Sequence, residues 1–329
     1  MRTGSIEMLT VRRVGYVALI IGFAQVVFGA IVRITGSGLG CGDHWPDCYG
    51  SYTPTSSATS HLVEISHRYG AATLSIAIVV LTLVALRHRG ATGIAGRGGA
   101  LRPTMLALLL VIVAALFGGA TVKMGLNPLV VVTHLAIAMS LLATLVVVVV
   151  RAGGFGAARV PARYERTFRS ARAAVGLTFL ALVFGALTAN TPGAPQACLG
   201  FPWCRIASGS GTPFWIQVTH RIIALLLLGH LTGIFLASRK RSESVVIRRA
   251  SAAALGVVVL QILVAAAMVE MNLPPSFRSL HQAVGTLLWI TVVALTALAN
   301  GSHGLTEIER IVYESPSRGE FATPEGVST

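Results

Sequence analysis

The sequence predicts an all-α integral membrane protein with eight transmembrane helices, arranged as two tandem four-helix bundles. Three observations support this expectation. The 329-residue chain is 54% hydrophobic and 12% charged, with a mean hydropathy of +0.74, whereas soluble domains carry about twice that charged fraction. Its apolar residues gather in runs long enough to cross a bilayer. Its two halves also repeat the same motifs in the same order.

Eight apolar runs of spanning length are separated by shorter polar segments. A helix needs about 20 apolar residues to cross the hydrocarbon core of a bilayer. The expected spans are 14–33, 62–86, 104–123, 128–150, 172–190, 213–237, 249–271 and 278–299. Because the number of spans is even, both ends of the chain are expected on the same side of the membrane.

The basic residues indicate which side that is. The chain has 26 lysines and arginines, and six of them fall on the side opposite the termini. The other 20 lie at the N-terminus, in the C-terminal tail, or in the loops 87–103, 151–172 and 238–249. Cytoplasmic loops are enriched in Lys and Arg, so we expect a protein of the plasma membrane with both termini in the cytoplasm. The same rule explains the net charge of +14 without a nucleic-acid partner.

Three motifs recur in the two halves of the chain. The sequence "VFGA" occurs at 27–30 and at 183–186, and "SHRYGAA" at 66–72 corresponds to "THRIIAL" at 219–225. The longest match aligns "VKMGLNPLVVVTHLAIA" without a gap on "VEMNLPPSFRSLHQAVG". Three anchors in the same order indicate a duplicated four-helix unit. Because each copy has an even number of helices, the repeat is parallel, which disfavours a transporter built from inverted repeats.

The repeat also predicts the domain organisation. An N-terminal half and a C-terminal half are joined by a cytoplasmic linker, and a disordered cytoplasmic tail follows. The expected boundaries are 1–150 for the N-terminal half, 151–171 for the linker, 172–299 for the C-terminal half and 300–329 for the tail.

Four of the nine histidines pair across the repeat. His67 corresponds to His220 and His134 to His281, and each lies in the first turns of an even-numbered span, on the outer side. Two imidazoles from different helices of a bundle are typical axial ligands of haem iron. A zinc or copper site would need further His, Cys or carboxylate ligands. Histidines that only pack between helices would not explain the equivalent positions, so the pattern predicts one haem in each half.

The two predicted sites differ three residues before the first histidine. Glu64 precedes His67, whereas Gln217 precedes His220. A carboxylate accepts protons or stabilises developing positive charge, and an amide does neither. We therefore expect the first site to be the reacting one and the second to hold a resident electron-transfer haem. The alternative for Glu64 is a charged group that snorkels to the interface at the mouth of a helix.

Basic residues and cysteines lie around the predicted sites. Guanidinium groups bind carboxylates in a bidentate manner, which suits the propionates of haem. The candidates for propionate contacts are Arg33, Arg68, Lys123 and Arg221. All four cysteines lie in outer loops, where an oxidising exterior favours the local disulfides Cys41–Cys48 and Cys198–Cys204 over free or metal-binding thiols.

Six segments between about residue 12 and residue 299 form a specific set of motifs. They are "RITGSGLGCGDHWPDC", "EISHRYGA", "NPLVVVTHLAIA", "TPGAPQACLGFPWC", "VTHRIIA" and "LHQAVGTLLW", in this order. Together they resemble the heme A synthase family of cytochrome oxidase assembly. The resemblance implies oxidation of the methyl group at ring carbon 8 of heme O to a formyl group, which gives heme A. This four-electron change would take its oxygen from water.

The resemblance also implies different tasks for the two halves. His67 and His134 would ligate the heme O substrate, with Glu64 as the catalytic carboxylate beside them. His220 and His281 would ligate a bound heme b. The farnesyltransferase that makes heme O (heme O synthase) would be a partner, together with an electron acceptor and the membrane lipid.

A second interpretation remains open from the residues. A di-haem cytochrome b-type membrane subunit, which exchanges electrons with quinone, would also need four histidines. This class does not explain the difference between Glu64 and Gln217, nor the two outer loops that carry cysteines.

Overall fold

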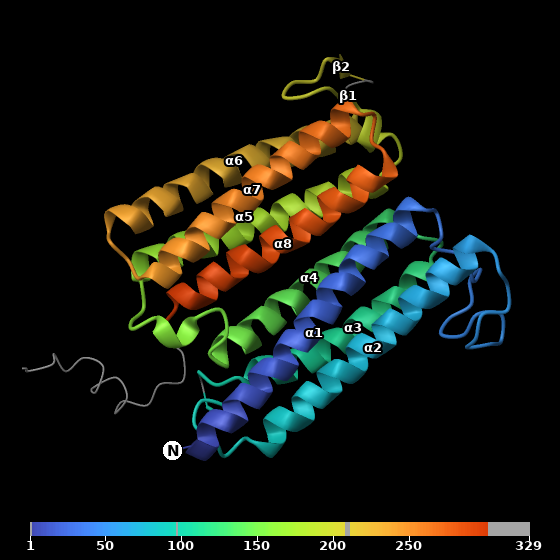
Figure 1. Cartoon of the computed structure of the whole chain (residues 1–329). Helices are drawn as coiled ribbons and strands as arrows, with labels where there is room; N and C mark the ends of the chain where they lie inside the picture. The colour runs from blue at the N-terminus through green and yellow to red at the C-terminus, as the bar shows by residue number, and fades with distance from the viewer. Residues whose placement is uncertain (1, 97, 208–210, 302–329) are drawn as a thin grey trace, which may run out of the picture.

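The computed structural model describes residues 2–96, 98–207 and 211–301. Within this part of the chain, eight α-helices are long and apolar enough to cross a membrane (Figure 1). The prediction of an all-α, multi-pass membrane protein is therefore confirmed. A helix satisfies its own backbone hydrogen bonds, as a segment in hydrocarbon must. The predicted tail lies outside the described residues, apart from its first two positions.

Each predicted span coincides with a helix. In chain order, the helices are α1 (Arg2–Ile34), α2 (Thr59–Arg87), α3 (Leu101–Lys123), α4 (Pro128–Arg151), α5 (Glu165–Asn190), α6 (Thr212–Lys240), α7 (Val245–Glu270) and α8 (Pro275–Ala299). Helix α5 begins inside the predicted linker. An ion pair between Glu165 and Arg169, one turn apart and 2.7 Å from each other, stabilises its charged first turn.

The remaining elements are short and lie in the connections. Two 3-10 turns, η1 (Ala157–Arg159) and η2 (Ala194–Gln196), precede and follow α5. Strands β1 (Cys198–Leu199) and β2 (Ile206–Ala207) then pair antiparallel in the loop before α6. This loop and the one between α1 and α2 extend from the same end of the molecule (Figure 1), and the two are called the outer loops from here on.

The helices of each half pack as a closed ring of four. Helix α1 contacts α2 and α4, and α3 contacts α2 and α4; helices α5 to α8 contact one another in the same way. Figure 1 shows the two groups side by side, with α1–α4 in blue to green and α5–α8 in green to red. Consecutive helices of an up-and-down bundle form such antiparallel neighbours.

Helix α8 lies at the centre of the contact between the two halves. It touches α1 and α4 of the first half as well as α5 and α7 of its own, and α4 also touches α5. In α8, 67% of the most apolar stretch is buried, against at most 39% in the other seven described spans. The indole N–H of Trp289 donates across the contact to the carbonyl of Met139 at 2.8 Å. The halves therefore share one continuous packed interior.

Candidate functional site

The four paired histidines occupy equivalent places in their helices. His67 and His220 both lie eight residues after the first residue of α2 and α6, and His134 and His281 both lie six residues after the first residue of α4 and α8. A proline at the first position starts both α4 and α8. Fixed helix starts place equivalent histidines at equivalent depths, near the end that carries the long loops.

In the C-terminal half, His220 and His281 face each other. Their ring centres are 6.4 Å apart and the ring planes meet at 78°. The Nδ1–H of His220 donates to the carbonyl of Ala181 on α5 at 2.9 Å, which leaves Nε2 as the nitrogen without a proton. Two imidazoles that share one metal ion through bonds of about 2 Å have ring centres about 6 Å apart. The pair therefore fits a metal held between the two rings.

Glycines of α1 and α5 make room for two of these rings. A Cβ added to Gly185 would lie 2.9 Å from Cε1 of His220, and one added to Gly29 would lie 3.1 Å from Cε1 of His67. The two glycines belong to the repeated "VFGA" motif. Both halves thus hold the first histidine against bare helix backbone, which limits how far the ring can turn.

The histidines of the N-terminal half also lie close together. His67 and His134 are near enough to interact electrostatically. Among the described residues, Nδ1 of His134 and Nδ1 of His281 are buried and have no hydrogen-bond partner. A buried polar atom without a partner is costly in a histidine that only packs. This observation favours ligand-binding pairs over the alternative of packing histidines.

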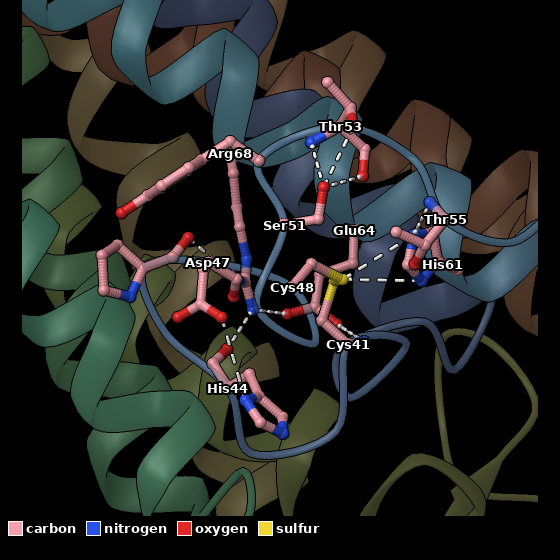
Figure 2. Close-up of a disulfide and its surroundings, with 12 residues drawn as sticks. Cys41, His44, Asp47, Cys48, Ser51, Thr53, Thr55, His61, Glu64 and Arg68 are labelled. Carbon is pink, nitrogen blue, oxygen red and sulfur yellow. Dashed lines mark hydrogen bonds and ion pairs between the residues drawn. A yellow bond between two sulfur atoms is a disulfide. The ribbon is translucent and has the colours of Figure 1, made fainter.

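Glu64 lies one helical turn outward of His67, with a side chain that is 5% exposed. One carboxylate oxygen accepts the backbone N–H of Cys41 at 2.8 Å, and the other forms an ion pair with Arg68 (Figure 2). The carboxylate is thus fixed between helix α2 and the outer loop that follows α1. This partnered, buried position differs from a snorkelling charge at a helix end.

The matching amide in the other half has the opposite hydrogen-bonding role. Nε2 of Gln217 donates to the carbonyl of Cys198 at 3.1 Å, and its Oε1 is buried without a partner among the described residues. In one half a carboxylate accepts from the first cysteine of the outer loop, and in the other an amide donates to it. The side chains at 64 and 217 therefore bind equivalent loops through different chemistry.

Arg68 and Arg221 anchor the outer loops. Each follows its histidine by one residue, and each donates to several loop carbonyls. The acceptors of Arg68 are His44, Pro46 and Asp47, and those of Arg221 are Cys198, Gly200 and Pro202. Arg33 donates to the carbonyl of Ala189 at 3.3 Å, from α1 to α5, and Lys123 is exposed. A propionate contact by any of these four residues stays a prediction.

Both predicted disulfides form in the outer loops. Cys41 bonds Cys48, and Cys198 bonds Cys204. Among the described residues, a buried histidine contacts the disulfide of the first half alone: Nδ1 of His61 is 3.5 Å from Sγ of Cys48 (Figure 2). The repeat places Phe214 at the corresponding position. Because His61 has no corresponding histidine in the second half, the sequence already indicated that the two disulfides have different surroundings.

A second anchor of the outer loops was missed from the sequence. Glu270, at the end of α7, pairs with Arg205 and accepts the N–H of Phe201 at 2.9 Å. The repeat places Lys123 at the corresponding end of α3. Glu270 therefore fastens the loop that carries Cys198 and Cys204 to a third helix, whereas the first loop has no matching carboxylate on α3.

Sequence comparison agrees with this architecture. Residues 12–293, most of the chain, match the family described as cytochrome oxidase assembly protein. The chain belongs to this family.

Several curated relatives are named heme A synthase. The protein of Alkalihalophilus pseudofirmus is 30% identical over 207 residues, which cover 61% of this chain and 67% of the relative. That of Lysinibacillus sphaericus is 28% identical over 228 residues, covering 64% and 69%. That of Bacillus cereus is 25% identical over 285 residues, covering 83% and 88%. The similarity to these relatives thus extends through both halves of the chain.

Arg68→Met should lower the thermal stability of this cytochrome oxidase assembly protein more than Arg221→Met does. Removing Arg68 leaves the buried Glu64 carboxylate without its cation, which typically costs about 3–5 kcal/mol, whereas Arg221 has only neutral acceptors. The midpoint of thermal unfolding in detergent measures both effects. The double variant Glu64→Gln/Arg68→Met should recover part of the loss. Equal losses in the two single variants, or no recovery in the double one, would contradict the pairing.

Proposed function

We propose that this protein is a heme A synthase, a membrane enzyme that oxidises the C8 methyl group of heme O to the formyl group of heme A. Family membership and the names of the relatives support the activity. The observation that carries the proposal is the pair of equivalent histidine sites, of which one has a buried carboxylate and the other an amide. In this proposal, the site with the carboxylate oxidises the substrate, and the site with the amide transfers electrons.

The N-terminal half holds the substrate in this proposal. His67 and His134 ligate heme O, and His220 and His281 ligate heme b. The 6.4 Å separation of the rings of His220 and His281, together with the free Nε2 of His220, supports ligation in the second half. When bound there, heme b supplies a one-electron carrier next to the reacting site. The surrounding chain supplies orientation and proton handling.

The carboxylate of Glu64 handles the protons. Converting a methyl group and one water into a formyl group releases four protons with the four electrons, so the reacting carbon needs a base nearby. Glu64 stands one turn from His67, and the Cys41 N–H and Arg68 hold its two oxygens in place. Arg68 in turn is fixed by the loop carbonyls, so the base is pre-positioned by the fold.

Heme extraction tests the activity against the cytochrome b-type alternative. Purified protein expressed together with the farnesyltransferase that makes heme O should carry heme O or heme A in addition to heme b. Without that enzyme it should carry heme b alone. An electron-transfer subunit would carry the same haem in both preparations. Family membership gives no support to this alternative. Heme O synthase and an electron acceptor are the partners the proposal requires.

We place the protein in the plasma membrane with both termini in the cytoplasm and the haem sites near the outer face. The excess of basic residues in the loops on the side of the termini supports this orientation. A reporter active only in the cytoplasm should be active when fused after Arg159 or Arg241, and silent when fused within 50–58. Activity in the reverse pattern would place the histidines near the cytoplasmic face.

His220→Ala and His281→Ala should each remove heme b. Each change takes away one of two axial ligands. The low-spin spectrum of the purified protein and its extracted heme b content provide the measurement. His230→Ala is the matched control, because His230 lies further along α6, contacts the carbonyl of Ser170 on α5, and should leave heme b in place. A normal low-spin heme b spectrum in both ligand variants would reject the assignment.

Glu64→Gln should stop or stall the oxidation while heme b stays bound. The change keeps the side chain's shape and copies Gln217, but an amide cannot take up protons, and losing a catalytic base typically costs about 10²–10⁴-fold in rate. Heme O or its alcohol should accumulate, which the ratio of heme A to heme O in membranes measures. Glu270→Gln, at the end of α7, is the control that should keep the ratio. A wild-type ratio in Glu64→Gln would remove Glu64 from the reaction.

A further inference from the structure

A cavity lies where the two halves of the chain meet, at the end of the molecule opposite to the outer loops. It has a volume of about 240 Å³, is partly open to the surroundings, and lies between the last turns of α4 and α8 and the first turns of α5 (Figure 1). We call it the junction cavity. Its lining is mostly apolar and includes Val147 and Val150 of α4, Phe168 and Val175 of α5, and Val293 and Ala297 of α8.

The apolar lining extends deep into the spans. Ala143, which belongs to it, lies eight residues before Arg151 at the end of α4, and this corresponds to about 12 Å along the helix. The hydroxyl of Thr296, also in the lining, donates to the carbonyl of Val292 at 2.9 Å, so its hydrogen bond is made within α8. Cavities lined by alkyl groups stay dry and take up apolar molecules.

A hydrocarbon chain suits this lining better than a polypeptide segment does. An acyl chain has no polar groups to satisfy. A peptide in the same place, such as the chain's own tail, would bring backbone amides among alkyl groups, where each one left without a partner costs free energy. The depth and chemistry of the junction cavity therefore indicate a lipid chain as its occupant.

Arg151 is at the polar end of the junction cavity. It is the last residue of α4, and its guanidinium group donates to the carbonyl of Gly99 at 3.0 Å. Arg102 is near enough to interact with it electrostatically, as a second positive charge. The segment 151–172, which connects α4 to the first turns of α5, contains six arginines and one acidic residue. The end of the cavity is therefore strongly basic.

Two further arginines lie at Phe168, which forms part of the lining. The guanidinium groups of Arg163 and Arg172 are over its ring, 4.5 Å and 5.6 Å from the ring centre. Such contacts hold a cation against an aromatic face. Glu165 pairs with Arg163 at 2.8 Å and with Arg169 at 2.7 Å. One carboxylate shared by two arginines leaves the positive charge in excess, which favours an anionic group at this place.

We propose that the junction cavity binds one phospholipid with an anionic head group. An acyl chain fills the apolar part, and Arg151, Arg163 and Arg172 bind the phosphate at the polar end. Guanidinium groups bind phosphate in a bidentate manner, and basic pockets between transmembrane helices are typical sites of anionic lipids. The lipid contacts α4 of one half and α5 and α8 of the other, and thereby stabilises their packing. The histidine sites take no part in this binding.

Native mass spectrometry in a non-ionic detergent tests the head-group contact. The full-length protein, freed of bound lipid, is titrated with dioleoylphosphatidylglycerol or with dioleoylphosphatidylcholine, which has the same acyl chains and no net charge. The wild-type protein should bind the first molecule of the anionic lipid more tightly. Arg151→Gln and Arg172→Gln should each weaken that binding about fivefold, the factor that one arginine near an anionic lipid corresponds to. Binding of the phosphatidylcholine should not change.

Arg239→Gln is the matched control. Arg239 lies at the same end of the molecule, and its guanidinium group is 4.6 Å from the ring centre of Phe235, but neither residue lines the junction cavity. Both lipids should bind this variant as they bind the wild type. Arg172 and Arg239 are both exposed, so neither substitution should disturb folding.

Ala297→Leu tests the apolar part of the site. The added carbon atoms take up volume of the junction cavity, so both lipids should bind less tightly. The midpoint of thermal unfolding should rise when the anionic lipid is added to the wild type, and it should rise less in this variant. The arginine variants test the head-group contact whether or not Ala297→Leu folds.

Two results would overturn the proposal. One is equal affinity of the wild type for the two lipids. The other is an affinity for the anionic lipid that is the same in Arg151→Gln, Arg172→Gln and Arg239→Gln. Either result is expected if detergent or the chain's own tail occupies the cavity. Because the experiment measures lipid and not haem, its outcome is independent of the synthase assignment.

Discussion

Hydrogen bonds from two arginines to loop carbonyls hold the rest of both histidine sites in place. Arg68 and Arg221 each stand one residue after a paired histidine, and each binds the carbonyls of the loop above it. A guanidinium group at the edge of a bilayer needs several acceptors, and loop carbonyls need donors. Satisfying both fixes each disulfide-bearing loop to the helix that presents the histidine. The placement of the loops on α2 and α6 and the buried position of Glu64 follow from these bonds.

The two halves share this arrangement and differ mainly in which side chains donate hydrogen bonds and which accept them. Glu64 accepts a hydrogen bond from its loop, and Gln217 donates one. The ring of His67 meets the side-chain amide of Gln25, and Nδ1 of His220 donates to the backbone. Neither difference alters the course of a helix. A duplicated scaffold can thus carry two sites of different chemistry because single polar side chains, not backbone rearrangements, set their properties.

The sequence predicted the helices, the repeat and the four histidines because these depend on local patterns. Apolar length determines a span, and the offset between halves pairs His67 with His220 without any knowledge of packing. The directions of long side chains could not be obtained this way. The carbonyls that Arg68 binds, for example, come together only in the folded loop, and a propionate contact of Arg68 stays a prediction. Gln25 on α1, whose amide nitrogen lies 3.0 Å from Nδ1 of His67 on α2, likewise joins two helices and leaves no periodic signal.

The contacts of α8 have a consequence for how the molecule arose. Exchanging the halves turns the α1–α8 contact into the α5–α4 contact, and both are present, while the α4–α8 contact maps onto itself. This is the isologous pattern of a two-fold homodimer, here written into one polypeptide. In a dimer of identical subunits every substitution occurs at both sites, so a carboxylate at one and an amide at the other is unattainable. Joining two copies end to end removed that restriction and allowed each site to evolve on its own.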